Sequence, residues 1–324
     1  MHASARTPRA LVGLGYALCC LLWGSTWPVV RVGLEDLPPL RFAALRMGLA
    51  LLCLTPVALR QGFKSLDRSK ALLLLGIGTV QIGLCYALQF LAQQWIPSAL
   101  AAILFATFAV WVQVSSRALL PGYRLSSAAL AAVGLGVVGV AVIQLPQLRG
   151  LRLGEHAALG AGLMLLGAVL CAVVNVIVRL KLSAVPPVIM TFGNLLGGAV
   201  VLLVLALAEA HVGGPAVEAA RFTPRAIFAL LHLSLLGTVA TYLTFFWLLP
   251  RLSMTAVGTI PLLDTTVAVL LGTVVLHEPL RPEVIAGGVL VLASVALANL
   301  RPGQEAGREE AVRADAVIAV EHAG

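Results

Sequence analysis

Long apolar runs separated by short polar stretches dominate the pattern of this chain. A helix that crosses a bilayer needs about 20 apolar residues. Ten runs approach or reach that length: 11–30, 40–59, 71–92, 98–119, 126–143, 157–178, 188–208, 226–249, 254–276 and 284–300. Because lipid offers no partners to free backbone groups, we expect each run to form one continuous helix. The pattern therefore predicts an all-α integral membrane protein with ten transmembrane helices.

The two halves of the chain repeat one another in sequence. Residues 22–31 (LWGSTWPVVR) align with residues 170–179 (LCAVVNVIVR), and 37–40 (LPPL) align with 185–188 (VPPV), both at an offset of 148. A later set aligns at an offset of 156, with Tyr86, Phe90 and Leu120 matching Tyr242, Phe246 and Leu276. The difference of eight residues fits a longer loop around 208–224 in the second half.

We therefore expect two five-helix repeats, over residues 11–143 and 157–300. Because each repeat has an odd number of spans, the second is inverted relative to the first. The halves are then related by a pseudo-two-fold axis in the membrane plane. Transporters are commonly built in this way, with the substrate site near the midplane between the repeats.

The composition agrees with a membrane protein. Hydrophobic residues make up 60% of the chain and charged residues 11%, with a mean hydropathy of +1.00, whereas soluble domains are about 25% charged. The net charge of +8 does not indicate a nucleic-acid partner, because the basic residues lie in loops between apolar segments. The five cysteines lie in apolar segments without metal-binding spacing. We therefore expect packing cysteines and neither a metal nor a cofactor.

The distribution of basic residues predicts the orientation. Of the 22 Lys and Arg residues, fourteen lie at the termini or in loops on their side, seven lie on the other side, and Arg46 lies within a span. This positive-inside bias places both termini in the cytoplasm. Residues 301–324 are polar and mixed in charge, which predicts a disordered cytoplasmic tail.

Short motifs that occur in a fixed order resemble a known family. They are Trp23-Gly24-Ser25, RVGL at 31–34, PPLRFAALR at 38–46, Pro261 and LHEP at 276–279. With the span count and the duplication, they resemble the EamA-type branch of the drug/metabolite transporter superfamily over residues 11–300. The resemblance implies a ten-helix carrier in the inner cell membrane that exports metabolites, amino acids or drugs. It does not indicate the substrate.

Two positions depart from the family pattern. The first-half turn reads LPGY at 120–123, without the acidic residue that Glu278 supplies in the second half. Phe105 stands where the second half has Pro261. The two halves have therefore diverged, and the second carries the clearer signature.

Asp264 is the only acidic residue deep in a span, about eleven residues into the ninth. A charge at this depth costs about 2.5–3.5 kcal/mol on translocon scales, so the side chain normally faces a cavity or a partner. Two interpretations stay open: proton coupling or binding of a cationic group, and a static structural carboxylate. Pro261 frees the carbonyl of Val257, so we expect a local kink beside Asp264.

Arg46 lies about six residues into the second span. Its planar guanidinium suits a carboxylate, so we expect it to face the cavity and to bind an anionic group of the substrate. The alternatives are snorkelling to the outer headgroups and a structural ion pair with Asp264. Asn194 aligns with Arg46 and lies in the GxxxG segment 193–197, which also indicates close helix packing.

Polar and aromatic residues form stripes on two further spans. On the third span Gln81, Cys85, Gln89 and Gln93 recur every four residues, with Tyr86 beside them. On the eighth span Thr238, Thr241, Tyr242 and Phe245 share one face. Such stripes face inward and line a substrate site, or they bond neighbouring helices. Trp23 is an interfacial anchor or a wall of the same site. His232 and His277 are candidates for a proton relay or, as is more common for histidines near span ends, interfacial residues.

The leading hypothesis is a secondary transporter in the inner membrane. It would export a small metabolite, amino acid or drug by alternating access, with protons as a candidate coupling ion. The sequence has no Walker motif for ATP hydrolysis. A membrane-embedded enzyme is the main rival, but the spans carry neither HExxH nor paired aspartates. An uptake carrier and a non-transport membrane protein are the remaining alternatives. The pattern does not indicate an oligomeric state.

Overall fold

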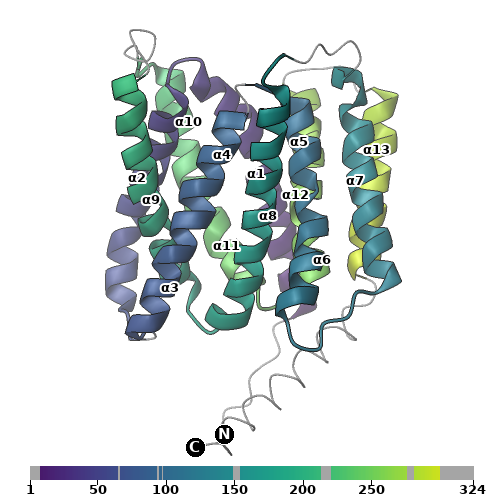
Figure 1. The fold of residues 1–324 in the computed structure, drawn as a ribbon, viewed down its shortest axis with the longest axis horizontal. Helices are drawn as coiled ribbons and strands as arrows, with labels where there is room; N and C mark the ends of the chain where they lie inside the picture. The colour runs from purple at the N-terminus through teal and green to yellow at the C-terminus, as the bar shows by residue number, and fades with distance from the viewer. Residues whose placement is uncertain are drawn as a thin grey trace, which may run out of the picture.

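The computed structural model describes residues 8–64, 66–92, 95–96, 98–148, 154–212, 220–275 and 281–299, and the regular secondary structure in these ranges is helical. The helices stand side by side as a bundle, with α2 and α9 packed together at one end of the row and α7 and α13 at the other (Figure 1). The bounds of the elements are α1 Arg9–Leu34, α2 Pro39–Gln61, α3 Arg68–Gly78, η1 Thr79–Leu84, α4 Cys85–Ala92, α5 Ser98–Ala106, α6 Phe108–Leu119, α7 Ser127–Leu148, α8 Ala157–Ile177, η2 Val178–Leu182, α9 Pro187–Val212, α10 Pro224–Ser234, η4 Leu235–Ala240, α11 Thr241–Leu248, α12 Met254–Val275 and α13 Pro282–Asn299.

Each apolar run predicted from the sequence is helical, and the bounds agree within a few residues. Eight segments of the described chain are long and apolar enough to cross a membrane: Arg9–Leu34, Pro39–Gln61, Arg68–Ala92, Leu100–Leu119, Ser127–Leu145, Ala157–Leu182, Pro187–Glu209 and Pro224–Leu248. The chain is thus an all-α, multi-span membrane protein. The predicted tail 301–324 and Gln93, His277 and Glu278 lie outside the described residues.

Helical elements recur at the offsets that align the two halves of the sequence. Helix α1, residues 9–34, is followed 148 residues later by α8 and η2, which together span 157–182. The elements α3, η1 and α4 recur as α10, η4 and α11, and each begins and ends 156 residues later. This correspondence includes the two π-helical segments η1 and η4, a rare form that is enriched at functional sites.

The expectation of continuous helices is wrong in the fourth apolar run, which breaks into α5 and α6 at Thr107. The Thr107 hydroxyl donates to the Leu104 carbonyl at 2.6 Å. The backbone N–H groups of Val110 and Trp111 bond to the Thr107 carbonyl at 2.8 and 3.1 Å. The break is tolerated because these backbone groups are satisfied within the protein.

Glycines allow several helices to pack with their backbones nearly touching. A Cβ atom on Gly197 of α9 would lie 2.2 Å from the Leu75 carbonyl oxygen on α3. A Cβ atom on Gly193 would lie 2.5 Å from the Leu74 side chain. Helix α9 therefore packs closely on α3 through the predicted GxxxG segment.

Candidate functional site

Arg46 of α2 is the buried basic group around which the candidate site is built. Only 4% of the surface of Arg46 is exposed. The guanidinium Nε donates to the Thr238 hydroxyl at 2.9 Å, and Nη2 donates to the Gly237 carbonyl at 3.1 Å. Its Cζ lies 5.6 Å from the centroid of the Tyr86 ring. Arg46 thus points into the bundle, and its contacts run to η4 and α4.

The π-helical form of η4 explains why the Gly237 carbonyl is available to Arg46. In an α-helix this carbonyl would accept from the backbone N–H of Thr241. Here that N–H bonds to the carbonyls of Leu236 and Thr238 instead. Gly237 also lets α1 approach, since a Cβ atom there would lie 2.6 Å from the Thr26 side chain. A π-bulge and a glycine thus expose one backbone acceptor to a buried cation.

Aromatic rings form a wall beside Arg46. Trp23 of α1 meets Tyr242 edge-on at 5.7 Å between ring centroids, and it meets Phe245 at 5.2 Å. Tyr86 lies next to Tyr242 and forms a side-chain polar contact with it. These two tyrosines align with each other in the duplicated sequence. The site is therefore formed where corresponding residues of the two halves meet.

His232 of α10 belongs to the same region. Its Nε2 lies 3.1 Å from the Ser25 hydroxyl oxygen on α1, and the ring is close enough to interact electrostatically with Arg46. His232 is half-buried in the last turn of α10 and contacts the candidate site. Helical spacing groups it with the exposed Leu235 and Leu236, so the sequence pattern did not indicate this position.

Buried amides form a second polar cluster on α8, η1 and α9. Gln81 donates to Asn175 at 3.2 Å, and Asn194 donates to Gln81 at 2.7 Å. Asn194 aligns with Arg46 at the offset of 148, and Gln81 aligns with Gly237 at 156. The Arg46–Gly237 contact and the Asn194–Gln81 contact therefore join matching pairs of positions, and each contact links one half of the chain to the other. Sequence analysis missed Asn175, although its amide lies in an apolar span.

The remaining predicted site residues, Thr241, Gln89 and Pro261, make the following contacts. The Thr241 hydroxyl donates to the Leu236 carbonyl at 2.6 Å, which satisfies it within its own helix. Gln89 is half-buried on α4 and packs near Gly167 of α8. Pro261 lies within α12, which continues through it as one helix, and its carbonyl accepts from Thr265 at 2.9 Å.

Asp264 of α12 is buried, with 7% of its surface exposed. It accepts from the Thr265 hydroxyl at 3.3 Å and interacts electrostatically with Tyr16 and Cys20 of α1. Gly24 brings α1 against this turn, since a Cβ atom there would lie 2.8 Å from the Asp264 carbonyl oxygen. Asp264 therefore packs on one face of α1.

Helix α1 packs both against α12, which carries Asp264, and against η4 and α11 beside Arg46. Tyr16, Cys20 and Gly24 recur every four residues and face α12. Trp23 and Thr26 face α11 and η4, on the Arg46 side. Among the residues that the structure describes, no group of three or more His, Cys, Asp or Glu side chains could hold a metal ion.

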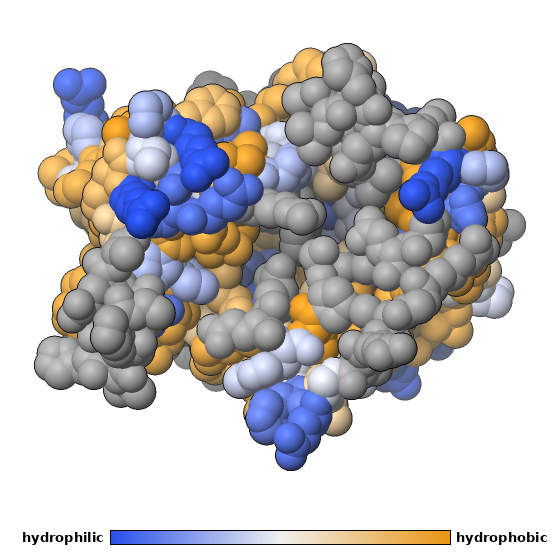
Figure 2. Space-filling model, turned by 90° about the horizontal axis from the view of Figure 1, so that it is seen from above, coloured by the Kyte–Doolittle hydropathy of each residue, from blue (hydrophilic) through white to orange (hydrophobic). Residues whose placement is uncertain are grey.

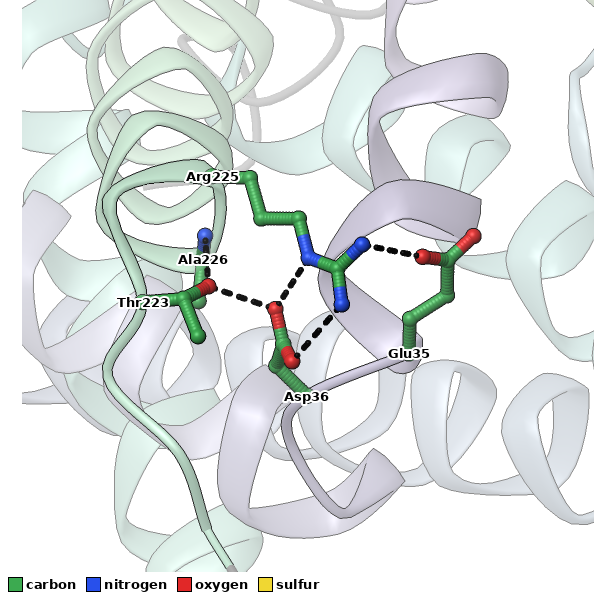
Figure 3. A network of polar contacts seen from close by, with 5 residues as sticks. All are labelled: Glu35, Asp36, Thr223, Arg225 and Ala226. Carbon is green, nitrogen blue, oxygen red and sulfur yellow. Dashed lines mark hydrogen bonds and ion pairs between the residues drawn. The ribbon is translucent and has the colours of Figure 1, made fainter.

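A polar latch closes one end of the bundle (Figure 3). Asp36, between α1 and α2, binds the Arg225 guanidinium through both carboxylate oxygens at 2.7 and 3.1 Å. Its carboxylate also accepts from the Thr223 hydroxyl at 2.6 Å. Glu35 adds an ion pair to Arg225 at 2.9 Å. The latch, defined as Glu35, Asp36, Thr223 and Arg225, ties the first half of the chain to the second.

The Arg225 hydrogen bonds hold the pKa of the Asp36 carboxyl below its ordinary range, and the Thr223 hydroxyl lowers this pKa further. A depressed carboxyl pKa means that the latch is present at neutral pH and is lost only as pH falls through the lowered value.

Leu37, Phe42, Leu230 and Leu233 form an apolar cluster with the alanines of α10 next to the latch. Viewed from above, hydrophilic residues form separate patches among apolar ones (Figure 2).

Comparisons with known proteins identify relatives along nearly the whole chain. An uncharacterized transporter, YoaV of Bacillus subtilis, is 27% identical over 291 residues, covering 88% of this chain and 95% of that protein. An uncharacterized inner membrane transporter, YedA of Escherichia coli K12, is 28% identical and covers 88% of this chain and 89% of its own. A probable amino-acid metabolite efflux pump of Salmonella typhimurium is 27% identical, and the alignment covers 86% of this chain and 91% of that protein.

A solved structure, titled only as the crystal structure of a protein, has the same fold. It superposes with a TM-score of 0.77 at 19% sequence identity, over 92% of this chain and 99% of its own. The model of the EamA-like transporter family matches residues 11–145 and 158–300, which is most of the chain. The resemblance seen in the short motifs is therefore confirmed, and the chain belongs to the EamA-like transporter family.

Proposed function

We propose that this membrane transporter has ten transmembrane helices in two inverted five-helix repeats, over residues 11–143 and 157–300, with the cargo site between them. The observation that carries the proposal is the meeting of Tyr86 and Tyr242, one from each half, beside the buried Arg46. Inverted-repeat carriers bind their cargo at such a junction.

The helix contacts support the inverted arrangement. Exchange of the two halves turns the α1–α12 contact into the α8–α6 contact, and the α4–α8 contact into the α11–α1 contact. The α2–α9 and α7–α13 contacts turn into themselves. A pseudo-two-fold axis between the halves accounts for all four pairs.

We further propose that the protein exports a small metabolite, amino acid or drug by alternating access, with both termini in the cytoplasm. The positive-inside bias of the loops supports this orientation. The printed name of the Salmonella relative, a probable efflux pump, supports export. Asp264 is the candidate for proton coupling, because it is the only acidic residue deep in a span.

In this mechanism the latch is the closure on the side opposite the termini. Alternating access requires the site to open to each side in turn, so the contacts between Asp36 and Arg225 must break when the site opens outward. The corresponding positions in the inverted half, Ser183 and Ala184 for Glu35 and Asp36, have no acidic side chain. The two closures are therefore chemically different.

The Arg225→Gln variant is expected to open this end more often. A Cys introduced for Leu37, which is 2% exposed beside the latch, should then react several-fold faster with a membrane-impermeant maleimide. The bidentate Asp36 contact contributes most of the restraint. Glu35→Gln is the matched control, because its ion pair joins two half-exposed side chains and contributes little. Equal labelling of the latch variant and the control would contradict the closure.

Extracellular metabolite profiling tests export. Cells that contain the wild-type protein are compared with cells that contain Asp264→Asn or Arg46→Gln at equal membrane abundance. We expect at least one solute to accumulate outside only with the wild type. A solute that is depleted from the medium would indicate uptake, and a chemically altered solute would indicate an enzyme. The absence of any difference would count against a transport role.

A further inference from the structure

We propose that the cargo is an organic anion with a flat apolar body, and that Arg46 binds its carboxylate. This inference rests on the proposed function and names the substrate class for the same site. It also adds His232 and the backbone at Gly237 to the residues that shape the site.

The charge balance around Arg46 is one-sided. Within the described residues, no carboxylate lies within the 4.0 Å ion-pair limit of its guanidinium. The His232 ring lies close enough to Arg46 to interact with it electrostatically. Burying an unpaired charge within a membrane is costly, so a counter-charge is expected at this position. Asp264 is not among the ion-pair partners of Arg46 in the described residues, and a bound anion would supply the missing charge.

Among the polar side chains described around the site, the hydrogen-bond donors left over belong to Arg46. The hydroxyls of Ser25 and Thr26 donate to the Leu22 and Trp23 carbonyls at 2.8 and 2.6 Å. Because Ser25 donates there, its contact with His232 has the imidazole Nε2 as the donor. A guanidinium has five N–H groups, and the two bonds of Arg46 start from Nε and Nη2. The Nη1 edge thus remains to bind a carboxylate.

The aromatic wall fits a flat apolar body. The Trp23 ring centroid lies 5.7 Å from that of Tyr242 and 5.2 Å from that of Phe245, and Tyr86 lies next to Tyr242. Rings in such a wall can stack on a planar ligand at offset or edge-on geometry. Aromatic rings also attract cations, but Arg46 already lies over Tyr86 and would repel a second positive charge. The site therefore disfavours a cationic cargo.

Three indole compounds of matched shape test the inference with purified full-length protein. They are indole-3-acetate, its neutral amide and tryptamine, and binding is measured by thermal stabilisation and titration. We expect the carboxylate to bind at least about tenfold more tightly than the amide, and tryptamine to bind most weakly. Arg46→Gln should abolish the preference for the carboxylate. Arg46→Lys should restore part of it, because lysine keeps the positive charge but cannot bind a carboxylate in the bidentate way of a guanidinium.

The control is Arg117→Gln on the exposed end of α6, which should bind like the wild type. Unchanged melting of the ligand-free Arg46→Lys protein shows that the variant is folded. Equal affinity for the carboxylate and the amide, tightest binding of tryptamine, or binding of none of the three would overturn the inference. Export of a neutral or cationic solute in the profiling experiment would leave the transport proposal standing while this inference falls.

Discussion

Cells that carry Asp264→Asn will fail to export cargo against its gradient, while the same variant will still exchange cargo across the membrane. Asp264 is ten residues into the 22-residue helix α12, near the middle of its length, and is 7% exposed. A carboxyl group at this depth can load and release a proton during the cycle, and an amide cannot. Cargo exchange should survive, because Arg46 donates its hydrogen bonds to Thr238 and Gly237 of η4 and not to Asp264.

The measurement is export from vesicles with and without a proton gradient. Wild-type export should rise with the gradient, and Asp264→Asn export should show no response to it. Asp67→Asn is the matched control, because Asp67 is an exposed helix cap and Asn is an equally good capping residue. A full pH response in Asp264→Asn would contradict coupling. Lower stability together with that response would identify Asp264 as a structural carboxylate.

Gly197→Ala should destabilise the protein by about 1–3 kcal/mol, the usual cost of overpacking a tight interface. The added Cβ atom would lie 2.2 Å from the Leu75 carbonyl oxygen and 3.0 Å from the Thr79 backbone nitrogen. Both are backbone atoms, so rotation of a side chain cannot relieve the clash. Helices α9 and α3 would have to separate, which also disturbs η1 and the Gln81 contacts.

Gly162→Ala is the matched control for this prediction. Gly162 is an exposed position on α8, and a Cβ atom there would meet nothing within 4 Å. Alanine within a helix is favoured over glycine by about 0.5–1 kcal/mol, so this variant should be slightly more stable. Unfolding free energies in mixed detergent provide the comparison. Similar stability of both variants would show that α9 and α3 do not pack as closely as the structure indicates.

The sequence alone predicts the helices well because each span is bounded by polar loops. The duplication is also readable, since residues such as Tyr86 and Tyr242 are retained at a fixed offset. Arg46 stands out because a basic residue inside a span is costly and needs partners. Its neighbours Trp23 and Thr238 follow from helical faces that carry aromatic or hydroxyl groups.

Other features depend on which helices pack together, and a single sequence does not contain that information locally. The π-helical form of η4 frees the Gly237 carbonyl, yet Gly237 has no side chain to signal a role. Asp36 and Arg225 are 189 residues apart in the chain and meet only through the packing of α1 against α10. In the predicted amide stripe, Gln81 of η1 is buried and Gln89 of α4 is half-buried, and Gln81 bonds to Asn175 and Asn194 on the neighbouring helices.

Counterflow in proteoliposomes tests the central claim most directly. Vesicles are loaded with an excess of the unlabelled anion identified by profiling, and a trace of the labelled anion is added outside. A wild-type carrier with an alternating site at Arg46 will accumulate the labelled anion inside the vesicles beyond equilibrium for a time. The Asp264→Asn variant will show the same transient accumulation, and the Arg46→Gln variant will show none. Wild-type protein that lets the label equilibrate without an overshoot, or not enter at all, would contradict this account.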